Sequence, residues 1–146
     1  MAQTKNNNAF LAEIYRGAKM GSESIKTLID KTKNALLRRE LLEQMKQYQD
    51  IEEKIYEELI VRGIKPKDVN PFQSSMAWVT VQFETMFNNK ADNIATILMR
   101  GNFMGVIGIT KSLNSHPNAD ETIKKFASDF INLIEKHNNN LKQFLR

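Results

Sequence analysis

The sequence contains no cysteine, and this absence excludes several kinds of chemistry. Disulfide frameworks, thiol nucleophiles and cysteine-ligated metals all need that residue. The chain also lacks any run of about 18 apolar residues, so we expect no membrane span. Its first residues, MAQTKNNN, hold no apolar segment of the kind found in secretion signals. These absences are compatible with a reducing compartment, and we expect a cytoplasmic protein.

The composition indicates one globular domain over residues 1–146. Hydrophobic residues make up 41% of the chain and charged residues 26%, which is typical of a folded domain of this length. The net charge of +4 is mild, and lysines are interspersed with glutamates, as on solvated helix faces.

One stretch, residues 89–114, organises our interpretation of the rest. Gly101, Gly105 and Gly108 follow one another at intervals of four and three residues, which places them on one side of a helix. Each glycine in a helix interior costs about 1 kcal/mol relative to alanine. We expect close packing of another helix to offset that cost, and this helix to be the innermost of the fold. A hinge or a cofactor gap at the glycines is the functional alternative.

Apolar residues recur every three or four positions through most of the chain, which predicts an all-α fold. The expected helices cover residues 10–30, 35–62, 72–87, 90–114 and 119–145. Residues 1–8 are polar and should be frayed, with Asn8 as a cap. In segment 72–87 the alternating Val79, Val81 and Phe83 would also fit a strand, but a lone strand would leave its backbone groups unpaired.

Local signals mark the ends of these helices. The segment DKTKN at residues 30–34 predicts a turn, with Thr32 or Asn34 capping the next helix, although a continuous helix is an alternative. Gly63 fits the left-handed position just past a helix end. Asn89 should cap the helix at 90–114, and Asn118 with Glu121 resembles a capping box.

Link lengths suggest how the helices assemble. Short links make the first two and the last two long helices antiparallel hairpins, and about 27 residues join the hairpins. That join is long enough to cross the whole bundle and to contain helix 72–87, so the helices on either side of it would be parallel. An alternating up-down-up-down bundle is the second possibility.

The segments EIYRGAKMGSESIKTLI, RGNFMGVIGITKSLN and HPNADE resemble small ferritin-like four-helix-bundle proteins of spore-forming Gram-positive bacteria. The resemblance covers most of the chain. It implies a bacterial, ferritin-like four-helix bundle with a long crossover, and it carries no catalytic signature.

The residues of a di-iron site are missing. Such a site needs inward glutamates and two Glu-x-x-His pairs, and the chain has no Glu-x-x-His. We therefore expect no enzyme activity of that kind and no cofactor, unless a divalent metal binds elsewhere. Glu52 and His137 lie in apolar stripes and are the candidates for such a metal or proton site, with Tyr48 nearby. The simpler alternative is that each finds an ordinary partner or reaches water.

Basic residues are densest near the second helix. This basic cluster consists of Lys31, Lys33, Arg38, Arg39 and Lys46. Without interleaved aromatic residues it is more typical of a solvated face than of a nucleic-acid site.

Three functions follow, in order of preference. The first is a non-enzymatic bundle that acts by self-association or contact with another protein. The second is a small metal- or ligand-binding bundle centred on Glu52 and His137. The third, which we consider weakest, is a basic protein that binds nucleic acid.

Overall fold

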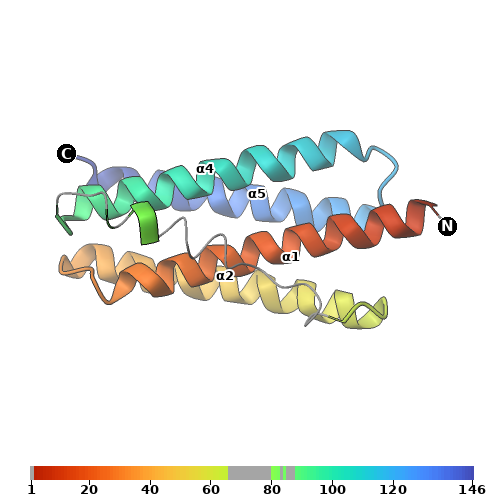
Figure 1. Cartoon of the computed structure of the whole chain (residues 1–146), viewed down its shortest axis with the longest axis horizontal. Coiled ribbons are helices and arrows are strands. Elements are labelled where there is room, and N and C mark those ends of the chain that lie inside the picture. Colours follow the sequence, from red (N-terminus) through yellow and green to blue (C-terminus); the bar gives the residue numbers. More distant parts are fainter. Residues whose placement is uncertain (1, 66–79, 83, 85–87) are drawn as a thin grey trace.

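The fold, a computed structural model shown in Figure 1, is all-helical where it is described, which confirms the predicted all-α class. The structure describes residues 2–65, 80–82, 84 and 88–146. Its elements are α1 (Ala2–Ile29), α2 (Ala35–Val61), α4 (Ala91–Ser115), α5 (Glu121–Leu141) and the short 3-10 helix η2 (Lys142–Phe144). None of the helices in these ranges is both long enough and apolar enough to cross a membrane.

The break between α1 and α2 lies where the sequence predicts it, so the continuous helix is excluded. The Asn34 side chain accepts a hydrogen bond from the Leu37 backbone N–H at 2.9 Å and caps α2. At the other end of α2, Gly63 has a φ of 74°. The Ile64 N–H bonds to the Leu59 carbonyl at 2.9 Å across it, which closes the helix as a Schellman motif does.

The predicted start of α1 is wrong. The helix begins at Ala2, so residues 2–8 are not frayed and Asn8 does not cap it. Contacts with another part of the chain hold this first stretch. The Asn7 side-chain oxygen accepts hydrogen bonds from the Gln3 amide and from the backbone N–H of Asp120, each at 3.1 Å.

Two predicted caps are also wrong. Lys90, without a side-chain cap bond, precedes α4, while the Asn89 side chain donates to the Lys31 carbonyl at 3.1 Å instead. Asp120 caps α5 by accepting from the Thr122 N–H at 2.8 Å, in place of the expected Asn118.

The predicted helix at residues 72–87 lies mostly outside the described residues. Only 80–82 and 84 belong to the described part of that segment, and these are helical.

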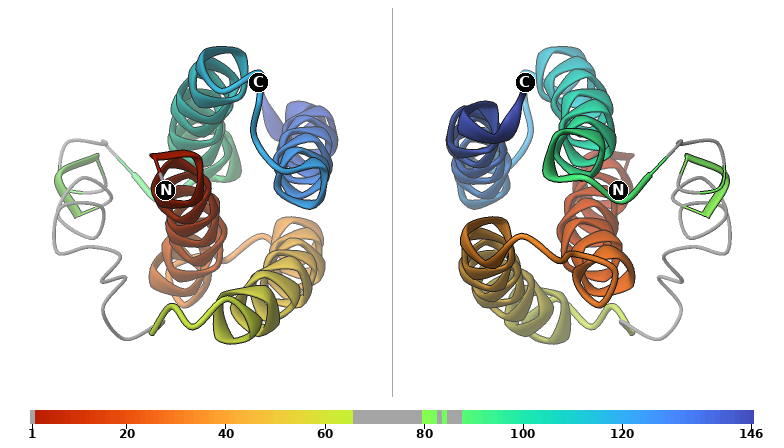
Figure 2. Two further views of the ribbon diagram at one scale, coloured as in Figure 1. Left: turned by 90° about the vertical axis from the view of Figure 1, so that its right-hand side faces the viewer. Right: turned by 90° about the vertical axis from the view of Figure 1, so that its left-hand side faces the viewer.

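The four long helices lie side by side as two hairpins, α1 with α2 and α4 with α5 (Figures 1 and 2). Viewed end-on, α1 lies beside α2 and α4, and α5 completes the ring next to the same two helices. Asn89, just before α4, contacts Lys31, just before α2. Helices α2 and α4 therefore run in the same direction, as a long crossover requires, and an alternating order is excluded (Figure 1).

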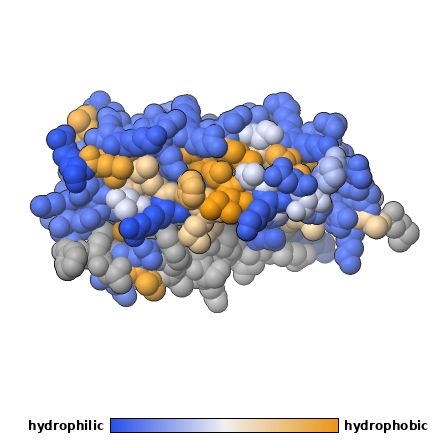
Figure 3. Space-filling model, turned by 90° about the horizontal axis from the view of Figure 1, so that it is seen from above, coloured by the Kyte–Doolittle hydropathy of each residue, from blue (hydrophilic) through white to orange (hydrophobic). Residues whose placement is uncertain are grey.

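The prediction that helix 90–114 is innermost is wrong. Ten residues of α1 are buried, against five of α4, because α1 contacts all three other long helices. The outer side of α4 carries the α4 patch, which we define as Phe103, Met104 and Ile107. These side chains are 61%, 56% and 42% exposed. Apolar side chains gather along the middle of this face of the molecule (Figure 3).

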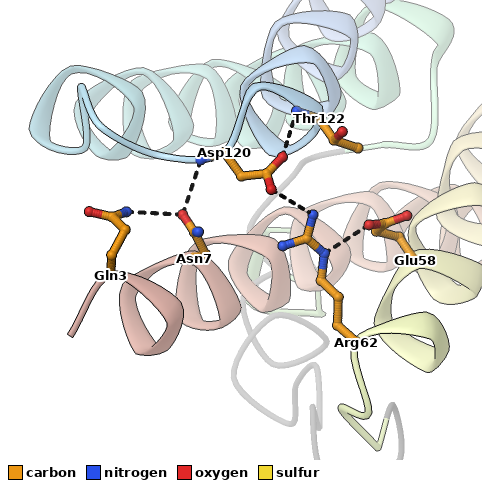
Figure 4. Close-up of polar contacts among 6 residues, drawn as sticks. All are labelled: Gln3, Asn7, Glu58, Arg62, Asp120 and Thr122. Atoms are coloured by element: carbon orange, nitrogen blue, oxygen red, sulfur yellow. Dashed lines mark hydrogen bonds and ion pairs between the residues drawn. The ribbon is translucent and has the colours of Figure 1, made fainter. Parts of the chain in front are cut away.

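A polar cluster ties three helix ends together (Figure 4). The Arg62 guanidinium, at the end of α2, pairs with Glu58 at 2.8 Å and with Asp120, at the start of α5, at 3.2 Å. The Asp120 N–H donates to Asn7 of α1. The hydrogen bond from Thr122, together with Arg62, lowers the pKa of the Asp120 carboxyl, so the carboxylate form is favoured.

Candidate functional site

An apolar cavity of about 220 Å³ lies between α1 and α4. Glycines form both of its long walls. Gly17 and Gly21 line it from α1, and Gly101, Gly105 and Gly108 line it from α4. On the α4 side, the absence of a side chain at Gly108 leaves space that no described atom fills.

The close helix packing predicted for the α4 glycines is not seen at Gly108, and for Gly101 it stays a prediction. Among the described residues, a Cβ atom on Gly108 would have no neighbour within 4 Å, and one on Gly105 would make an ordinary contact with the Ile134 Cδ1 atom at 3.7 Å. Gly101 is half-buried and lines the cavity. Gly17 and Gly21 of α1 line the same cavity.

Close approach occurs instead at the two glycines of α1. A Cβ atom on Gly17 would lie 2.8 Å from Cε2 of Phe130, and one on Gly21 would lie 3.0 Å from Cδ2 of Tyr48. Glycine here lets two aromatic rings pack against the backbone of α1.

These rings, with Ile134, form the inner wall of the cavity. Tyr48 comes from α2, and Phe130 and Ile134 come from α5. The Tyr48 ring is 1% exposed and meets Phe130 edge-on at 6.2 Å and His137 edge-on at 4.5 Å between ring centroids. The contacts from two sides fix this wall.

A chain of hydrogen bonds links three helices next to the cavity. The Tyr48 hydroxyl donates to the Asn102 side-chain oxygen at 3.2 Å, and the Asn102 amide donates to Asn138 at 2.9 Å. Burial raises the pKa of Tyr48, so the hydroxyl keeps its proton. The polar groups at this end of the cavity are thus paired with one another.

Two charged side chains, Glu13 and Arg16, line the other end of the cavity, and only one of them has a partner among the described residues. The Glu13 carboxylate accepts a hydrogen bond from the Ser112 hydroxyl at 2.7 Å. Arg16 is half-buried and also lines the cavity, but it makes no hydrogen bond or ion pair with the residues the structure describes. Within the described part of the chain, Arg16 is therefore a cation without a partner on a mostly apolar wall.

His137 lies in the core behind the Tyr48 ring and does not line this cavity. Its side chain is 0% exposed, and its Nε2 atom lies 2.8 Å from the Gln47 side-chain oxygen. That acceptor places the ring proton on Nε2, while the buried Nδ1 atom has no hydrogen-bond partner. Burial, together with the charge of Lys136, lowers the pKa of His137 to about 4, so the ring is neutral at pH 7.

Glu52 makes a separate contact, with α1. It is half-buried, and one carboxylate oxygen accepts from the Ser22 hydroxyl at 3.2 Å. Burial raises the pKa of this carboxyl, and the hydrogen bond from Ser22 opposes that shift. No hydrogen bond or ion pair joins Glu52 to His137, and the described residues contain no group of three or more potential metal ligands.

The basic cluster gathers at the turn before α2 and along its first half. All five residues are exposed. Arg38 also donates to the Ile29 carbonyl at 2.7 Å and so closes the end of α1. None of the five lines the cavity.

The sequence analysis missed Arg16, Gly17 and Asn102. A signal for the cavity was nevertheless present, because Gly17, Gly21 and Ser24 repeat the four-three spacing of the α4 glycines. When two neighbouring helices carry stripes of small residues with the same spacing, a space remains between them. It closes only where side chains from other helices occupy it.

No protein-family model, curated protein or solved structure matches this chain, so its function is argued from the site alone.

Proposed function

We propose that this chain is a non-catalytic, ferritin-like four-helix bundle that binds a small apolar molecule in the cavity between α1 and α4. The single observation that carries the proposal is the apolar cavity of about 220 Å³. An apolar cavity of about 150 Å³ in another protein takes up benzene. A cavity somewhat larger than that suits a fused bicyclic ring or an eight-carbon chain.

The energetics of α4 support the same interpretation. A glycine inside a helix costs about 1 kcal/mol relative to alanine. None of the residues that the structure describes packs against the place a Cβ would take on Gly108. Helix packing therefore does not offset the cost at this position. Contacts with a bound molecule would offset it.

The arrangement of the helices supports the ferritin-like part of the proposal. Two antiparallel hairpins joined by one long crossover form the layout of that superfamily. Bundles of this kind commonly place their ligand sites between helices. We propose an organic ligand for this chain, because the two candidate metal ligands, Glu52 and His137, have separate partners.

The test is binding of naphthalene, a neutral apolar probe, measured by its fluorescence and by amide shifts in NMR spectra. Gly108→Leu is the cavity-filling variant. Asn114→Leu is the matched control, because it adds the same side chain at an exposed position of the same helix. We expect binding to the wild type and to Asn114→Leu, at least tenfold weaker binding to Gly108→Leu, and no loss of thermal stability in that variant. The proposal is wrong if the wild type does not bind naphthalene, or if Gly108→Leu binds it equally well.

The α4 patch favours a second candidate function, which is weak self-association. Three neighbouring, largely exposed apolar side chains are a feature of contact sites. Three side chains are far fewer than the roughly 20 to 30 residues, or about 800 Å², that each partner contributes to a stable complex. We therefore expect a dimer only at high concentration. Sedimentation velocity should show concentration-dependent association that Phe103→Gln abolishes, and a strict monomer at millimolar protein would exclude it.

A further inference from the structure

We infer that the molecule bound in the cavity is an amphipathic anion, with an apolar body along the glycine walls and a single carboxylate-like group on Arg16. This inference rests on the proposed function, and it adds the chemical class and the orientation of the ligand.

The shape of the cavity suits an elongated apolar body. Gly101 and Gly108 are separated by about 10 Å along α4 at the rise of an α-helix. Both line the same cavity, as does Met20 of α1. This length is comparable to that of an extended chain of about eight carbons.

The charge of the head group follows from the two ionised side chains that line the cavity. Glu13 already accepts a hydrogen bond from Ser112 at 2.7 Å, whereas Arg16 has no partner among the described residues. A half-buried guanidinium has lost part of its hydration without gaining hydrogen bonds. Its planar fork of donors matches a carboxylate with two parallel hydrogen bonds. An anionic oxygen group is therefore the partner this site lacks.

The register of α1 against α4 gives the orientation. These helices are antiparallel (Figure 1), and the contact between Glu13 and Ser112 fixes which residues face each other. Arg16 therefore lies toward the Gly108 end of the cavity. Tyr48 and Asn102 line the other end, where they satisfy each other. The apolar tail should thus point away from Arg16 toward the Tyr48 ring.

The experiment compares three probes of one chain length, namely octanoate, 1-octanol and octylammonium, by isothermal titration calorimetry below their micelle concentrations. The variants are Arg16→Gln, which removes the charge, Arg16→Lys, which keeps it without the fork, and Arg39→Gln, a control that removes an exposed arginine of α2. We expect octanoate to bind the wild type about tenfold more tightly than octanol does, as one charge-assisted contact allows.

Arg16→Gln should reduce octanoate binding to the level of octanol and leave octanol unchanged. Arg16→Lys should retain part of the preference for octanoate over octanol, and Arg39→Gln should retain all of it. Equal binding of octanoate and octanol, unaffected by Arg16→Gln, would overturn this inference while the proposed function stands. Tighter binding of octylammonium would also overturn it and make Glu13 the anchor. Failure of all three probes, and of naphthalene, would remove both proposals.

Discussion

Glycine serves two opposite purposes in these helices. Gly17 and Gly21 make room for aromatic rings, because a Cβ on either would lie within about 3 Å of Phe130 or Tyr48. Gly108 makes room for nothing that the described part of the chain supplies. The same residue at the same spacing thus marks a tight contact on α1 and an empty space on α4.

Substitution by alanine should change the stability in opposite directions at these two kinds of glycine. Tyr48 is held by its hydrogen bond to Asn102 and by the His137 ring, so it cannot retreat from a new methyl group. We expect Gly21→Ala to lower the free energy of unfolding by about 1–3 kcal/mol. Gly108→Ala should raise it by up to about 1 kcal/mol through helix propensity. Urea denaturation measures both, and effects of the same sign would contradict this account.

The spacing of the glycines could be read from the sequence, but their surroundings could not. Periodicity gives the face on which Gly101, Gly105 and Gly108 lie. Whether that face meets a helix or a cavity depends on the side chains opposite, and these come from α1, about 85 residues earlier along the chain. For the same reason Arg16 could not be assigned to the cavity, since its own helix offers nothing that sets it apart.

The burial of His137 should make the stability of the fold depend on pH. The folded state keeps this ring neutral to about pH 4, while the unfolded chain protonates it near pH 6.5. The unfolded state therefore binds more protons between these values. Stability is fully present above pH 6.5 and falls by about 3 kcal/mol as the pH drops to 4.

The variant His137→Gln isolates this contribution, because glutamine does not titrate and can still donate to Gln47. Glu52, whose pKa is raised, opposes the loss in both proteins and cancels in the comparison. Unfolding by urea at pH 7, 5.5 and 4 should show a shallower decline for the variant. Parallel curves would rule out His137 as the cause.

At the scale of the elements, helix ends were predictable where the signal is local. Asn34 caps the helix that directly follows it, and Gly63 terminates the helix that directly precedes it. The start of α1 was not predictable, because Asn7 is held by Asp120 from the far end of the chain. The parallel directions of α2 and α4 were predictable from the length of the segment that joins them. The identity of the innermost helix was not predictable, because apolar periodicity does not show how many neighbours a helix has.

The Asp120 cluster gives a prediction at this scale. Asp120→Ala removes both the cap of α5 and the ion pair with Arg62. We expect it to cost about 1–2 kcal/mol of unfolding free energy, chiefly through the cap. Asp120→Asn keeps a cap acceptor and should cost less than half as much, because an ion pair whose two side chains remain partly accessible to solvent contributes little. Equal losses in the two variants, measured by denaturation, would assign the effect to the ion pair instead.

On the scale of the whole molecule, the two hairpins are packed more closely within themselves than against each other. The cavity lies at the boundary between them, lined by α1 on one side and by α4 on the other. Space at that boundary removes contacts that would otherwise couple the hairpins. Partial opening along this boundary should therefore cost less than global unfolding.

Native-state hydrogen exchange can detect this difference. We expect the amides of residues 101–110 in α4 to exchange with a lower opening free energy than those of residues 41–55 in α2, whose buried face packs on α1 and α5. Gly108→Leu should reduce this difference in opening free energy, because its side chain restores contact across the boundary. Asn114→Leu should leave the difference unchanged. If α4 opens only with the whole molecule in the wild type, the cavity does not weaken the joint between the hairpins.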